Sequence, residues 1–111
     1  MSPKIDFTTL NKVASVGQYV ATINYDADNS AYTPTQDGFI IGNCIMNVNV
    51  EGYCFLHNTA KNVYIGGIVH NPALSTSMQI LVNVPVKAGE QILFRISGGR
   101  FDGGFYKADC S

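Results

Sequence analysis

The sequence predicts an all-β protein, an antiparallel β-sandwich of seven or eight strands. Apolar residues recur at every second position along most of the chain, which is typical of strands with one face on a core and one in water. Turn-forming residues interrupt this alternation about every 8–12 residues, as in sandwiches and barrels. No segment shows a capped helical period, apart from a short candidate at residues 7–16. The length of 111 residues fits one domain.

The N-terminal part gives the least regular pattern. We expect residues 1–16 to form an arm or linker and residues 17–111 to form the domain. A short helix over residues 7–16, or a first strand there, remains open. In residues 17–25, alternate positions from Tyr19 to Tyr25 share one face and predict the first strand of the domain.

The middle of the chain predicts two strands and a hairpin. Even-numbered residues are apolar or small throughout residues 39–50, and a second strand follows from Tyr53. Glu51-Gly52 lies between these runs and predicts a tight hairpin that makes them adjacent. Polar residues 58–62 predict the next turn.

The C-terminal half contains further alternating runs. Residues 78–84 and 92–97 predict two strands. Gly98-Gly99 and Asp102-Gly103-Gly104 predict two late turns, and a last strand begins at Phe105.

Two segments, residues 32–40 and 84–92, share one pattern. Each places a proline a few residues before a glycine, next to an acidic residue, and then begins an apolar run. Proline fixes φ and cannot donate to a sheet, so it suits a strand start or edge, while glycine permits the positive φ of a turn. Each segment therefore predicts a turn beside a strand.

These segments resemble parts of the C-terminal jelly-roll domains of bacteriophage tail-fibre and appendage proteins. Tyr32-Thr33-Pro34 with Asp37-Gly38, Val50-Glu51-Gly52, Pro85-Val86-Lys87-Ala88-Gly89-Glu90 and Phe105-Tyr106-Lys107 are similar to the strand entry, hairpin, turn and closing strand of such domains. The architecture is also similar to C1q and tumour-necrosis-factor-like jelly rolls. Glu90 stands where aspartate is commoner in the family.

The resemblance implies a viral structural and receptor-binding module, a homotrimer in the phage tail that is made in the host cytoplasm. Its partner would be a host-surface glycan or protein, or another virion protein. The alternative is a carbohydrate-binding module or lectin-like domain of a bacterial protein. An enzyme is a third class, which we do not expect.

Charge and hydropathy exclude several functions. The seven Lys and Arg residues are scattered and the net charge is −1, so we expect no nucleic-acid partner. No apolar run approaches the length of a membrane span, and we expect no membrane insertion. The first residues lack the apolar core of a secretory signal.

Candidate catalytic and metal-binding residues are few, and we expect no catalytic site, metal or cofactor. Cys54, His57 and an aspartate could form a nucleophilic set, but the motifs that support one are absent; His57 and His70 suit strand ends. Residues 26–30 alternate oxygen-bearing side chains without the remainder of a calcium loop, and a solvated turn is preferred. The histidines and cysteines lack zinc spacing.

The chain has three cysteines, and an odd number cannot all pair in disulfides within one chain. Cys44 and Cys54 fall in runs predicted to be adjacent, so a cross-strand disulfide is conceivable, but buried free thiols are the preferred interpretation. The state of Cys110 is left open.

Aromatic residues supply the candidate binding residues. Tyr32, Tyr53, Tyr64 and Tyr106 adjoin predicted turns, where tyrosine can stack on a sugar ring. Several strands, such as residues 53–56 and 80–82, are apolar on both faces, which predicts burial of a second face against another subunit.

Overall fold

The computed structural model describes residues 15–48, 51–70 and 77–109, and within these ranges every regular element is a strand. No helix long and apolar enough to cross a membrane occurs among these residues. The strands confirm the predicted all-β class and number eight: β1 (Ser15–Tyr25), β2 (Ser30–Tyr32), β3 (Gly38–Met46), β4 (Gly52–Asn58), β5 (Val63–His70), β6 (Met78–Val86), β7 (Ile92–Ser97) and β8 (Gly99–Asp109).

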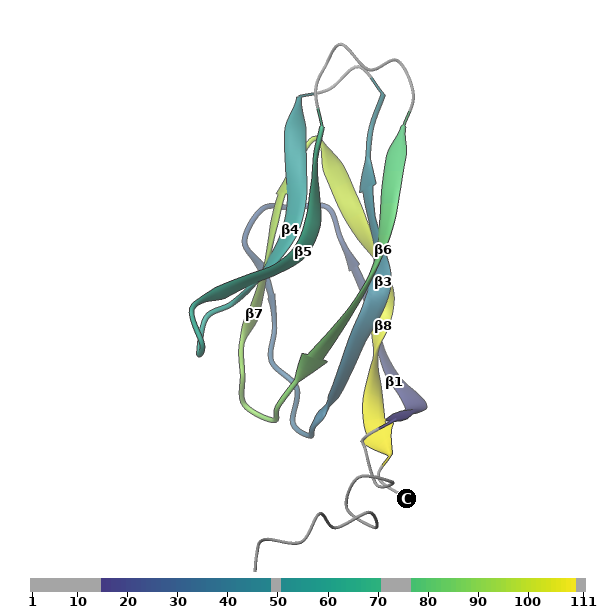
Figure 1. Ribbon diagram of the computed structural model, residues 1–111, viewed down its shortest axis with the longest axis vertical. Coiled ribbons are helices and arrows are strands. Elements are labelled where there is room, and N and C mark those ends of the chain that lie inside the picture. Colours follow the sequence, from purple (N-terminus) through teal and green to yellow (C-terminus); the bar gives the residue numbers. More distant parts are fainter. Residues whose placement is uncertain (1–14, 49–50, 71–76, 110–111) are drawn as a thin grey trace, which may run out of the picture.

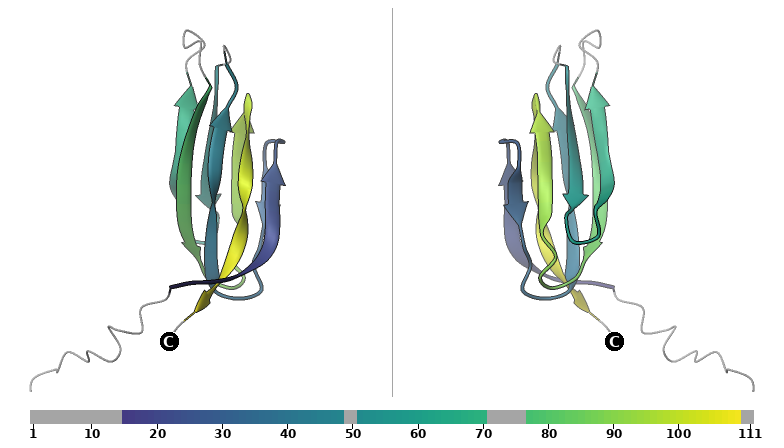
Figure 2. Two further views of the ribbon diagram at one scale, coloured as in Figure 1. Left: turned by 90° about the vertical axis from the view of Figure 1, so that its right-hand side faces the viewer. Right: turned by 90° about the vertical axis from the view of Figure 1, so that its left-hand side faces the viewer.

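The strands form two four-stranded antiparallel sheets that pack as a sandwich (Figure 1). One sheet has the order β1-β8-β3-β6 and the other the order β2-β7-β4-β5. In each of the two views of Figure 2 a different sheet faces the viewer. The edge strands are β1 and β6 in the first sheet and β2 and β5 in the second. The chain alternates between the two sheets from strand to strand, except that β4 and β5 are neighbours in one sheet. This order of strands is that of a jelly roll, which combines two Greek keys.

The core lies between the sheets and is made by every second residue of the strands. In β3 and β4 the burial pattern alternates strictly, as the sequence predicted. Phe94 and Phe101, from opposite sheets, are fully buried with ring centroids 4.9 Å apart. The buried apolar residues are Ile23, Ile40, Cys44, Met46, Cys54, Leu56, Val82, Val84, Val86, Ile92, Phe94, Ile96, Phe101 and Phe105.

The two proline–glycine segments lie side by side at one end of the sandwich. The N–H of Gly89 donates to the carbonyl of Pro34 at 2.9 Å, and the N–H of Ala88 donates to Oδ1 of Asp37 at 2.9 Å. Pro34 is fully buried, and Gly89 has φ +84°, a value that disfavours other residues. Two hydrogen bonds therefore join segments that lie about fifty residues apart in the sequence.

The predicted hairpin at Glu51-Gly52 is wrong. β3 pairs with β6 and β8, and β4 pairs with β5 and β7, so the chain crosses from one sheet to the other between them. Alternation identifies which side chains face inward, but it does not identify the neighbouring strand. Cys44 and Cys54 consequently face each other across the core as buried free thiols, not side by side in one sheet. Cys110 lies outside the described residues.

The predicted turn at Asp102-Gly103-Gly104 is also wrong, because these residues lie within β8. Gly103 pairs with Gly42 of β3, and a Cβ on Gly103 would lie 2.3 Å from the carbonyl oxygen of Ile41. The glycines are needed for close approach of two backbones, not for a turn.

The predicted arm at residues 1–16 is described only at its end, where Ser15 and Val16 begin β1. These two residues pair with Asp109 and Ala108 of β8. The alternatives for residues 7–14 lie outside the described residues.

Candidate functional site

The outer face of the β2-β7-β4-β5 sheet carries a cluster of aromatic side chains, which we call the aromatic face. Alternation along β4 places Tyr53, Phe55 and His57 on this surface, because Cys54 and Leu56 point into the core. Strand pairing then sets their neighbours on both sides. The aromatic face consists of Tyr53, Phe55, His57, Tyr64, Val69, Leu93 and Arg95.

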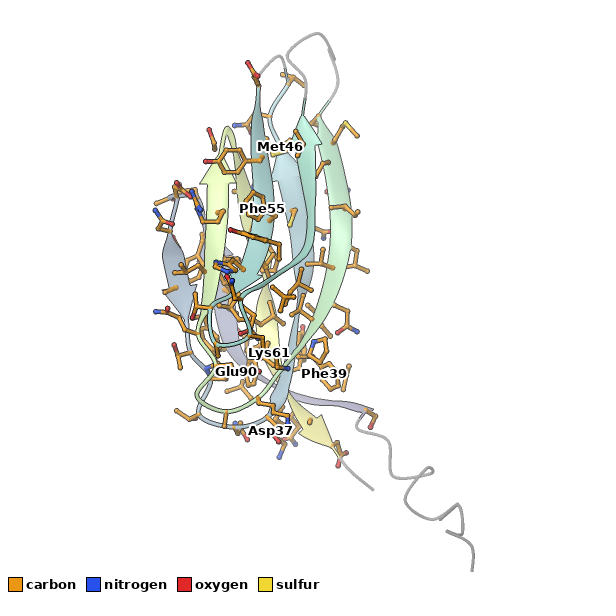
Figure 3. The ribbon with its side chains drawn as sticks, turned by 60° about the vertical axis from the view of Figure 1, so that its left-hand side comes forward. Asp37, Phe39, Met46, Phe55, Lys61 and Glu90 are labelled. Carbon is orange, nitrogen blue, oxygen red and sulfur yellow. The ribbon has the colours of Figure 1, made fainter. Side chains whose placement is uncertain are left out.

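The rings on this face contact one another in a continuous row. The ring centroids of Tyr53 and Phe55 are 5.3 Å apart, and those of Phe55 and Tyr64 are 5.5 Å apart in an edge-to-face arrangement. His57 stacks on Tyr64 with centroids 4.4 Å apart and an interplanar angle of 18°. Tyr64 is 64% exposed, so the row presents ring surface to solvent. Figure 3 shows Phe55 partway along β4.

A shallow hollow of about 530 Å³ lies over β5, beside Phe55. Phe55 pairs with Gly67 and Leu56 pairs with Ile65, so Gly66 is the extra residue of a β-bulge. Its φ of +56° is the left-handed value that such a bulge requires. A Cβ on Gly67 would lie 2.3 Å from the Cβ of Phe55. Glycine at position 67 is therefore needed for the close approach of β5 to Phe55, and the hollow is also lined by Tyr64, Gly66 and Val69.

Polar groups border the aromatic row. Arg95 pairs with Phe55 in the register of β7 and β4, and its Nε–H donates to Oδ1 of Asp28 at 3.0 Å. The side-chain hydrogen bond from Arg95, with the N–H of Ile96, lowers the pKa of Asp28. At the other margin, Nε2 of His57 lies 3.1 Å from Oδ1 of Asn62. The face thus combines an apolar centre with hydrogen-bonding groups at two edges.

The structure separates the four tyrosines that the sequence suggested as binding residues. Tyr53 and Tyr64 lie together on the aromatic face. Tyr32 ends β2 with its ring against the core, 5.5 Å from Phe105, and burial raises its pKa. Tyr106 lies on the opposite sheet, where its ring contacts that of Tyr19 at 5.7 Å.

The candidate catalytic set is not assembled. Cys54 faces the core, whereas His57 faces outward and stacks on Tyr64, so the two side chains lie on opposite faces of β4. In residues 26–30, the Asp28 carboxylate accepts hydrogen bonds from Arg95, Ile96 and Asn29. These hydrogen bonds stabilise the turn. Across the described ranges, no three His, Cys, Asp or Glu residues converge to hold a metal ion.

Sequence reasoning missed Phe55, Gly67 and Arg95 as members of this surface. It selected tyrosines because they adjoin turns, although the alternation Tyr53, Phe55, His57 already placed three rings on one face of a strand. Arg95 could not be found in this way, because its place beside Phe55 depends on the pairing of β7 with β4, about forty residues away.

Comparisons with known proteins do not assign the chain to a family. No protein-family model matches the chain, and no curated protein sequence matches it. Among solved structures, a family 35 carbohydrate binding module from an environmental isolate is similar with a TM-score of 0.34 and 11% sequence identity, covering 87% of this chain and 81% of that chain. At so low a score, the likeness carries no information about what this chain binds.

Proposed function

We propose that this chain is a non-catalytic recognition module that binds a glycan on the aromatic face. The observation that carries the proposal is the row of Tyr53, Phe55 and Tyr64 rings beside an open hollow with polar groups at its margins. This proposal takes up the carbohydrate-binding alternative that the sequence left open.

The chemistry of a sugar matches this arrangement. A pyranose ring has apolar C–H groups on its faces and hydroxyl groups around its edge. The C–H face packs on aromatic rings such as Phe55 and Tyr64, while the hydroxyls need donors and acceptors at the side. Arg95 and Asp28 stand at one margin, and His57 stands at the other.

The charges favour a neutral sugar. The charged side chain of the aromatic face, Arg95, is paired with Asp28, and the two formal charges cancel. An acidic sugar would have to compete with Asp28 for the guanidinium. We therefore expect neutral hexoses or their oligomers to bind more tightly than uronic or sialic acids.

The test is a glycan array with the full chain, followed by calorimetry with the best neutral glycan. Tyr64→Ala removes the most exposed ring of the row. It should weaken binding about two- to twelvefold, because an aromatic stacking contact is worth about 0.5–1.5 kcal/mol. The matched control is Tyr19→Ala, which removes a ring that is 54% exposed on the other sheet. This control should bind like the parent chain.

Two results would contradict the glycan site on the aromatic face. One is the absence of binding to any glycan on the array. The other is an equal loss of affinity in Tyr19→Ala or Tyr106→Ala, which would move the site to the outer face of the β1-β8-β3-β6 sheet.

The second candidate is the viral role that the resemblance implies, a homotrimeric phage appendage that attaches to a host surface or to another virion protein. The observation that favours an assembly is the exposure of apolar side chains on β6, such as Ile80 at 42% and Leu81 at 66%. Three copies would convert weak single contacts into firm attachment. Adsorption of the purified protein to bacterial cells tests this role, and its absence across candidate hosts would count against it.

A further inference from the structure

One side of the sandwich, between β5 and β6, is poorly covered. These strands are the edge strands of opposite sheets, and they approach each other where Gly66 faces Val82. Six exposed large apolar residues of the described ranges lie on these two strands: Val63, Tyr64 and Val69 on β5, and Met78, Ile80 and Leu81 on β6. Three others, Val16, Tyr19 and Val20, lie on β1, at the opposite edge of the sheet that contains β6.

The inward face of β6 is covered along only part of its length. Val82, Val84 and Val86 face the core and are 7% exposed or less. Ile80 lies on the same face of the strand, two residues before Val82, yet it is 42% exposed. Its neighbour on β3, Cys44, is fully buried. The core is therefore closed at β3 but open at β6.

β6 also lacks the features that protect the other edge strands. β1 contains two irregularities in its register, β2 is only three residues long, and β5 carries the bulge at Gly66. β6 keeps an unbroken register with β3 over nine residue pairs, with a single proline near its end at Pro85. A regular edge strand without charges is a template for pairing with another chain.

We propose that a second copy of this chain packs on the β6 edge, defined as Met78, Gln79, Ile80 and Leu81. Neither β5 nor β6 contains Asp, Glu, Lys or Arg, and the net charge of the chain is −1. Two copies of this edge can therefore pack together without repulsion between like charges. A charged partner would find no side chain of opposite charge on the edge. The apolar residues of each copy would cover those of the other.

Two β6 edges that meet each other form a twofold dimer, so this inference is separate from the homotrimer of the second candidate, and it does not depend on glycan binding. The β6 edge lies in the β1-β8-β3-β6 sheet, whereas the aromatic face belongs to the other sheet. An assembly could therefore form with the aromatic faces accessible. A monomer that binds a glycan would overturn this inference alone, and an oligomer that binds none would overturn the glycan proposal alone.

The test is sedimentation velocity of the full chain over a range of micromolar concentrations. The parent chain should form a closed oligomer, and Leu81→Lys should weaken its association at least about tenfold, because like charges would then face each other. Leu81 is 66% exposed, so this change leaves the core intact. Val20→Lys is the matched control, since Val20 is 43% exposed on β1, the opposite edge of the same sheet.

Hydrogen exchange of the parent chain provides a second measurement that needs no variant. Amide protection in β6 should rise with protein concentration, while protection in β1 should not. A parent chain that stays monomeric would overturn the proposal, and so would equal dissociation by Val20→Lys. Protection of β6 that is the same at every concentration would also overturn it, because a segment of the same chain would then cover the edge.

Discussion

Replacement of Gly103 by alanine should destabilise the fold strongly, although the sequence placed this glycine in a turn. Gly103 lies in β8 opposite Gly42, in the middle of the β1-β8-β3-β6 sheet. An added Cβ would lie 2.3 Å from the carbonyl oxygen of Ile41 and 2.6 Å from the Cα of Gly42. Both contacts are with backbone atoms, so no side-chain rotation can relieve them.

The loss of stability in Gly103→Ala depends on how far the backbones of β3 and β8 must separate. Overpacking of a core costs about 1–3 kcal/mol when side chains can adjust. Here β3 and β8 must separate, so we expect the upper end, about 3 kcal/mol. Domains of this size are stable by only about 5–15 kcal/mol. At about 4 °C per kcal/mol, the unfolding midpoint should fall by about 12 °C.

Thermal unfolding by calorimetry measures this effect, with Gly89→Ala as the control. Gly89 has φ +84° and nothing within 4 Å of an added Cβ, so its replacement costs only the backbone strain, about 1 kcal/mol. A turn position would give Gly103→Ala a cost no larger than that of Gly89→Ala. A midpoint loss for Gly103→Ala that does not exceed the loss for Gly89→Ala would refute the close-approach explanation.

Two further predictions concern titration and thiol reactivity. Hydrogen bonds from Arg95 to Asp28 and from the Lys87 N–H to Glu90 lower the pKa of both carboxyls, so their contribution to stability is present above about pH 4 and is lost as the pH falls through the folded-state values. Denaturant titrations from pH 5 to about pH 2 should show this loss, and a slope unchanged in Asp28→Asn would contradict it. The hydrogen bond to Cys54 and burial raise the pKa of the Cys44 thiol, so iodoacetamide should label Cys44 far more slowly in folded than in unfolded protein. Mass spectrometry of the Cys44 peptide measures the rate, and equal rates in the two states would show that the thiol is accessible.

The proline–glycine segments show how far local sequence can be used. Each segment predicts a turn next to a strand, and the structure has one there, because proline and glycine restrict or extend φ in any tertiary context. Their mutual hydrogen bonds, from Ala88 to Asp37 and from Gly89 to Pro34, could not be predicted. These bonds depend on loops that meet only after the two sheets have formed.

The candidate site, too, was predictable from the sequence only in part. Alternation along β4 predicts that Tyr53, Phe55 and His57 share a face, and that part was available from the sequence. Arg95 and Tyr64 join this face through pairing with β7 and β5. The hollow beside them is lined in part by Gly66, the bulge residue at which the register of β4 and β5 shifts, and this shift could not be predicted from alternation.

The sequence by itself determined that the chain forms strands, which side chains of β3 and β4 face the core, and where several turns begin. These properties follow from period-two alternation and from the φ preferences of proline and glycine, which act over a few residues. Only the tertiary structure decided that β3 and β4 lie in different sheets and that β1 pairs with β8 from the far end of the chain. Alternation is identical whichever strand becomes the neighbour, so the choice of partner depends on packing of the whole chain.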